Sequence, residues 1–118
     1  MAGGRRTIDE VSLIVADRTV NTEGSGAHAA AQFYVDVTAI TRTTGSLTVT
    51  VRWRTKDGST VTVATLGSIT ATGVYRLTPT ANVFDTAGRA IPEPTQANWD
   101  LGGDATDVSG IIYALYGN

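Results

Sequence analysis

The sequence predicts an all-β fold, a single antiparallel β-sandwich of about six to eight strands. Three observations indicate it. The composition is rich in Thr, Val, Ala and Gly, and only 17% of residues are charged, below the usual quarter. Several short segments alternate apolar and polar side chains with period two and are separated by turn residues. No segment holds three turns of helical periodicity, and 118 residues fit one domain.

The chain begins with the small, basic run Met-Ala-Gly-Gly-Arg-Arg. This run predicts a flexible N-terminal arm over residues 1–6, followed by the single sandwich domain over residues 7–118. From Ile8 to Val20 the side chains alternate with period two, which predicts one strand, with an inner face of Val11, Leu13 and Val15.

A turn cluster at residues 21–26 precedes a second predicted strand over residues 33–40, with Phe33, Val35 and Val37 on one face. The clearest element is the hairpin that follows. Thr and Arg alternate strictly with four apolar residues, a turn lies at residues 56–59, and a second alternating strand spans residues 61–65. Period two predicts a core face of Leu47, Val49, Val51 and Trp53 and places Arg52 and Arg54 on the solvent side.

The remaining elements are shorter. We expect a strand over residues 73–78, ended by Pro79, a loop crossing between the sheets at residues 81–90, and a proline-stiffened extended segment at residues 91–94. A strand containing Trp99 spans residues 96–101, a tight turn follows at residues 102–104, and a last strand covers residues 108–116. A jelly roll and an immunoglobulin-like sandwich share this spacing, so the strand order stays open.

Charge and cysteine content narrow the function classes. A net charge of −2 argues against nucleic acid or an anionic membrane as a partner. The absence of cysteine excludes disulfides, thiolate metal sites and cysteine nucleophiles. We see no signal peptide and no apolar run long enough to cross a bilayer, and expect a soluble protein made in a cytoplasm.

Residues that carry catalysis do not form a recognisable constellation. His28 is the only histidine, and no Gly-x-Ser-x-Gly motif accompanies it. The glycine-rich run at residues 102–107 lacks calcium-loop spacing. A glycosidase would need a carboxylate pair, but the candidate acids lie in turns, where aspartates bond neighbouring N–H groups: Asp36, Glu93, Asp100, Asp104 and Asp107. We therefore expect no enzyme, no cofactor and no metal.

Two groups of side chains suit binding. Arg52 and Arg54 serve either to keep the sheet soluble or to dock on carboxylates of a partner subunit. The tyrosines and Trp99, which follows the polar residues Gln96 and Asn98, are candidates for sugar stacking. A protein-docking surface and a glycan platform are thus both open from the residues alone.

The C-terminal part carries a resemblance. Its features are Ala-Ile-Pro-Glu-Pro at residues 90–94, Trp-Asp-Leu-Gly-Gly at 99–103 and the apolar end at 111–117, after the Thr/Val-rich hairpin at 47–66. In pattern and order, over residues 35–117, the chain resembles small virion proteins of tailed bacteriophages, of the minor capsid or decoration type. No catalytic motif supports the resemblance.

The resemblance implies a jelly-roll-like sandwich that binds the outside of an assembled head, commonly as a homotrimer, and stabilises the capsid lattice. The partner would be the major capsid protein, and the location the outer surface of the virion head. Candidate capsid contacts are Arg5 and Arg6, in an arm that could clamp a neighbouring subunit, and Arg52 and Arg54 on the hairpin. The alternative is a carbohydrate-binding module or a tail or head-fibre module.

Overall fold

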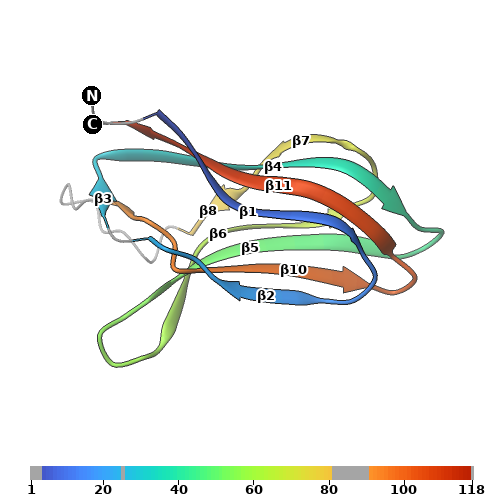
Figure 1. The fold of residues 1–118 in the computed structure, drawn as a ribbon, viewed down its shortest axis with the longest axis horizontal. Helices are drawn as coiled ribbons and strands as arrows, with labels where there is room; N and C mark the ends of the chain where they lie inside the picture. The colour runs from blue at the N-terminus through green and yellow to red at the C-terminus, as the bar shows by residue number, and fades with distance from the viewer. Residues whose placement is uncertain (1–3, 25, 81–90, 118) are drawn as a thin grey trace.

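The protein is a sandwich of two antiparallel sheets (Figure 1). A computed structural model describes residues 4–24, 26–80 and 91–117, which form eleven strands and no helix. The first sheet has the order β1-β11-β4-β7, formed by Gly4–Ile14, Thr106–Gly117, Ala30–Thr41 and Gly73–Arg76. The second has the order β2-β10-β5-β6-β8, formed by Arg18–Asn21, Gln96–Gly102, Ser46–Arg54, Thr60–Ile69 and Thr78–Pro79. The predicted β-sandwich is confirmed.

The strand order is that of a jelly roll. Apart from three two-residue strands, β8 and the separate β3–β9 ribbon (Ala27–His28 and Ile91–Pro92), eight strands remain. Taken in chain order, these pair as first with last, second with seventh, third with sixth and fourth with fifth. The chain is therefore one long antiparallel ribbon, folded back at the β5–β6 hairpin and rolled so that successive pairs alternate between sheets. This order excludes the immunoglobulin-like alternative.

The core lies between the two sheets and matches most of the predicted faces. Phe33, Val35 and Val37 are buried, and the hairpin residues Leu47, Val49 and Val51 are completely buried. Trp53, expected in the core with them, lies at its margin and is only partly buried. Trp99, a candidate for sugar stacking, is completely buried, because the β10 side chains on its face point between the sheets.

The predicted continuous strand over Ile8–Val20 is wrong. The chain leaves the first sheet after Ile14 and enters the second at Arg18, so β1 and β2 belong to different layers. Leu13 has a φ of 49° at this corner, and the register of β1 against β11 slips beside it. As a result Leu13 and Val15 are 60% and 71% exposed and do not form the expected inner face.

The predicted N-terminal arm is also too long. Strand β1 begins at Gly4, and the β11 ladder holds Arg5 opposite Leu115 and Arg6 opposite Ala114. Strand β11 offers twelve residues of backbone for pairing, enough to extend β1 over both arginines. Residues 1–3 of the arm and the expected crossing loop at residues 81–90 lie outside the described residues.

Candidate functional site

Three polar clusters and two sheet faces are the places where this fold could carry function. The first cluster centres on Asp9, which is buried between β1, β2 and β10. Its carboxylate accepts two hydrogen bonds from Arg18, at 2.9 and 3.0 Å, and one from the Trp99 Nε1–H at 2.8 Å. Burial by itself raises the pKa of Asp9, but the hydrogen bonds from Arg18 and Trp99 outweigh it and leave the pKa lowered. All the contacts are internal, so the cluster joins the sheets.

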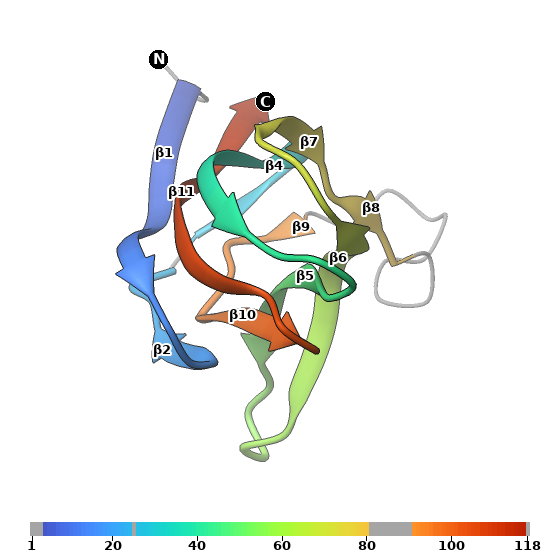
Figure 2. The ribbon, with the colours of Figure 1, turned by 90° about the vertical axis from the view of Figure 1, so that its right-hand side faces the viewer.

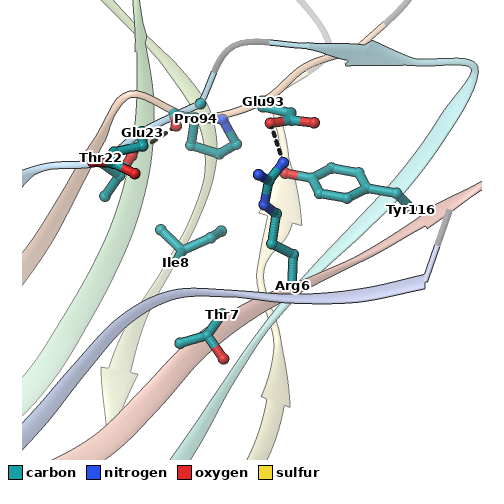
Figure 3. A pocket seen from close by; sticks show the side chains of 9 residues that line it. Arg6, Thr7, Ile8, Thr22, Glu23, Glu93, Pro94 and Tyr116 are labelled. Atoms are coloured by element: carbon teal, nitrogen blue, oxygen red, sulfur yellow. Dashed lines mark hydrogen bonds and ion pairs between the residues drawn. The ribbon is translucent and has the colours of Figure 1, made fainter.

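The second cluster centres on the buried carboxylate of Glu93 (Figure 3). The Arg6 guanidinium lies 2.7 Å from Oε1 of Glu93, and Nε2 of His28 lies 2.7 Å from Oε2. The His28 ring in turn stacks on Tyr116, with ring centroids 4.0 Å apart. The cluster therefore ties β1, β3 and β11 to the segment after β9.

A hollow of about 120 Å³ lies beside Glu93, between Arg6, Thr22 and Tyr116. Burial and the nearby Glu93 charge raise the pKa of Tyr116 far above its ordinary value. The hollow is smaller than the sites that bury drug-sized ligands, and the Glu93 charge already faces Arg6. The arrangement is suited to joining the ends of strands.

The third cluster centres on Asp104, which lies in a turn as predicted but bonds a different loop instead of its own neighbouring N–H groups. Its carboxylate accepts hydrogen bonds from the backbone N–H groups of Thr43, Thr44 and Gly45. Hydrogen bonding from the Gly45 N–H lowers the pKa of Asp104. Across residues 4–24, 26–80 and 91–117, no three His, Asp or Glu side chains come together as metal ligands. The same residues contain no helix that could span a membrane.

The hairpin places Arg52 and Arg54 on the outer face of the second sheet, as predicted. Arg52 donates hydrogen bonds to Asn98 and Thr62, each at 3.0 Å. Asn98 continues the network to Thr19 at 2.8 Å. We refer to this surface as the threonine face; its network joins β2, β10, β5 and β6. Arg54 is exposed at the end of β5, so only one of these two arginines is free of the network.

The outer face of the first sheet has a different character. Tyr113 of β11 stacks on Tyr34 of β4, with centroids 5.4 Å apart, and the Arg5 guanidinium of β1 lies 4.2 Å from the Tyr113 centroid. Beside them Leu115 is 40% exposed, and Val74 of β7 is 59% exposed. We refer to this surface as the tyrosine face, defined by Arg5, Tyr34, Val74, Tyr113 and Leu115. Among the described residues it carries two of the four exposed large apolar side chains, whereas the other two, Leu13 and Val15, lie at the corner between β1 and β2.

The four predicted contact arginines are thus separated. Arg5 lies on the tyrosine face, Arg6 faces Glu93, and Arg52 and Arg54 lie on the threonine face. The tyrosine face itself was not identified from the sequence. The signal was present, because period two in the last strand puts Tyr113 and Leu115 on the face opposite the buried Ile112 and Ala114.

Comparison of the chain with protein-family models, with curated proteins and with solved structures finds no match. The strand order and the chemistry of the surfaces are therefore the basis for a functional proposal.

Proposed function

We propose that this protein is a structural virion protein of a tailed bacteriophage, a minor capsid or decoration protein. It binds the outside of the head through contacts with the major capsid protein and stabilises the capsid lattice. The observation that carries the proposal is the tyrosine face, in which exposed Leu115 and Val74 flank the Arg5–Tyr113–Tyr34 stack. The jelly-roll strand order also supports it, since viral capsid domains commonly use this architecture.

The tyrosine face has the composition of a protein interface. Tyrosine and arginine are enriched where proteins meet, and clustered exposed apolar side chains on a soluble domain mark interaction sites. The stack fixes Arg5 and Tyr113 before binding, which lowers the entropy that association would otherwise cost.

Attachment at several points multiplies modest contacts. A copy that touches several capsid subunits gains affinity because the second and third contacts are intramolecular. A homotrimer, as the resemblance implies, would present three such faces together. The threonine face contributes less, because none of the exposed large apolar side chains of the described residues lies on β10, β5 or β6.

The test is binding to heads that lack the protein, prepared from the phage that encodes it. Leu115→Asp should reduce occupancy by roughly tenfold or more, since it buries a charge in the contact. Thr60→Asp, exposed at the start of β6 in the other sheet, is the matched control and should bind normally. Equal occupancy for the wild type and Leu115→Asp would overturn the use of this face, and binding to tails alone would favour the fibre alternative.

The carbohydrate-binding alternative is less well supported, because the aromatic rings proposed as its platform are buried or covered. Trp99, its best platform residue, is completely buried. Arg5 and Tyr34 approach Tyr113 from strands on opposite sides of β11 and cover the ring faces on which a sugar would stack. A glycan array would decide: binding that disappears in Tyr113→Ala would favour this class over the structural one.

A further inference from the structure

The outer edge of β1 is unpaired. Strand β1 is the end strand of its sheet, and Figure 2 shows no described strand beyond it. With eleven residues it is long for an edge strand, and such an edge presents backbone N–H and C=O groups to any strand that can match it. Natural edges are protected by charged side chains and by bulges, among other devices. Strand β1 has both, but its exposed charges are of both signs, so they do not uniformly repel a second copy.

Strand β1 carries both signs of charge in two blocks, Arg5 and Arg6 near its start and Asp9 and Glu10 further on. The ladder to β11 tells which face each occupies. Arg5 lies opposite Leu115 and Glu10 opposite Ile111, on the outer face, whereas Asp9 lies opposite the buried Ile112. In the part of the chain that the structure describes, Glu10 is exposed and has no ion-pair partner.

A β-bulge makes this arrangement possible. In a regular strand, residues five apart point to opposite faces, so Arg5 and Glu10 would lie on different sides. The β1–β11 register slips between Thr7 and Asp9, which inserts Ile8 as an extra residue. The bulge brings the positive and the negative side chain onto one face of the edge strand.

Strand β1 can pair antiparallel with β1 of a second copy in several registers. Only one of them sets oppositely charged side chains against each other on the same face of the sheet. With the two-fold axis between Thr7 and Ile8, Arg5 faces Glu10 of the second copy on the outer side, twice by symmetry, and the two bulges meet at the axis. A register one residue away pairs side chains from different faces. A register two residues away sets Arg5 against Ser12 or Ile8, neither of which is charged.

We propose that the protein forms a two-fold dimer in which β1 pairs antiparallel with β1 of a second copy, in the register that sets Arg5 against Glu10. The two four-stranded sheets then join as one continuous sheet across the axis. The tyrosine faces of both copies lie on the same side of that sheet, since Arg5 belongs to each. This inference is independent of the proposed function, and it differs from the trimer that the resemblance implies.

The first test is sedimentation velocity over a concentration series. The wild type should form a dimer of twice 12.3 kDa. Glu10→Arg should raise the dimer dissociation constant by about tenfold or more, because like charges then face each other at both symmetric positions. The charge swap Arg5→Glu with Glu10→Arg should restore the wild-type constant. Arg76→Glu on β7, at the other end of the sheet, is the matched control and should not change it.

A cross-linking test reads the register directly, because a disulfide traps the dimer even where the loss of both charges weakens it. The native chain contains no cysteine. The double variant Arg5→Cys with Glu10→Cys should form an intermolecular disulfide under mild oxidation, because side chains directly opposite in an antiparallel pair have Cβ atoms about 4.5–5.5 Å apart. Arg5→Cys alone should not cross-link. A monomer at all concentrations, a trimer, or cross-linking by the single variant would each overturn the proposal.

Discussion

Asp9→Ala tests how the two sheets are held together. The substitution removes a carboxylate that accepts hydrogen bonds from Arg18 on β2 and from the completely buried Trp99 on β10. It leaves the surrounding apolar core unchanged. In this variant the buried Trp99 Nε1–H no longer has the Asp9 carboxylate as its hydrogen-bond acceptor.

The magnitude follows from these contacts. A buried donor without an acceptor costs about 1–3 kcal/mol. The Arg18 side chain is 40% exposed, so solvent screening limits its ion pair to about 1 kcal/mol or less. The free energy of unfolding should therefore fall by about 1–4 kcal/mol. For a chain of this length, that is a decrease in Tm of roughly 4–16 °C.

A double-mutant cycle with Trp99→Phe separates the two contributions, measured by chemical denaturation. The phenylalanine has no N–H to leave unsatisfied, so Asp9→Ala should cost about 1–3 kcal/mol less in that background. An equal cost in both backgrounds, or a cost under about 0.5 kcal/mol for Asp9→Ala alone, would refute the reasoning, since the latter is typical of a neutral surface change.

Asp9→Asn adds a pH test. Burial opposes ionisation of Asp9, but the hydrogen bonds from Arg18 and Trp99 dominate and lower its pKa in the folded state. Its contribution is therefore present above the pKa of the unfolded chain and is lost as the pH falls through the lower folded pKa. The variant should lose less stability in acid than the wild type. The pKa of Asp57 and that of Asp104 are also lowered, by bonds from Thr55 and from the Gly45 N–H, so some acid sensitivity remains.

Two further substitutions test local features. Gly110→Ala would place a Cβ 2.6 Å from the Asp36 backbone oxygen, and it should lower the free energy of unfolding by about 1–3 kcal/mol in a denaturant titration. Gly117→Ala on the same strand meets its nearest neighbour at 3.4 Å and should change little. Asp104→Ala removes the acceptor for the loop before β5, so the Thr43–Gly45 amides should exchange with solvent faster by NMR; unchanged exchange would contradict that role.

Much of the fold could be predicted because hairpins are local. The β5–β6 hairpin reads directly from alternation, since both strands and the turn lie within a few residues of each other. The corner after Ile14 could not be read in this way. Apolar residues continue through it without a glycine or proline, and only the ladder to β11 and the change of sheet reveal the break.

In the candidate site, too, local features could be predicted from the sequence and contacts between distant residues could not. Trp99 has polar neighbours in sequence, but those side chains lie on the other face of β10, so composition misplaced it. Arg6 and Glu93 are 87 positions apart, and nothing local predicts that they meet. The solvent side of Arg52 was correct, yet its partners lie on neighbouring strands and became visible only with the sheet order.

The pairing of the first long strand with the last, Gly4 opposite Tyr116, has a consequence for how the chain reaches its native state. In the first sheet β11 lies between β1 and β4. During synthesis, this sheet therefore cannot form completely until β11, the last strand, has been made. Contacts that span nearly the whole sequence carry a large loop-closure entropy and fold slowly. Until β11 has been synthesised, both edges of β1 are unpaired. In that interval β1 of a second nascent chain, which carries the complementary charges, can pair with β1 in place of β11.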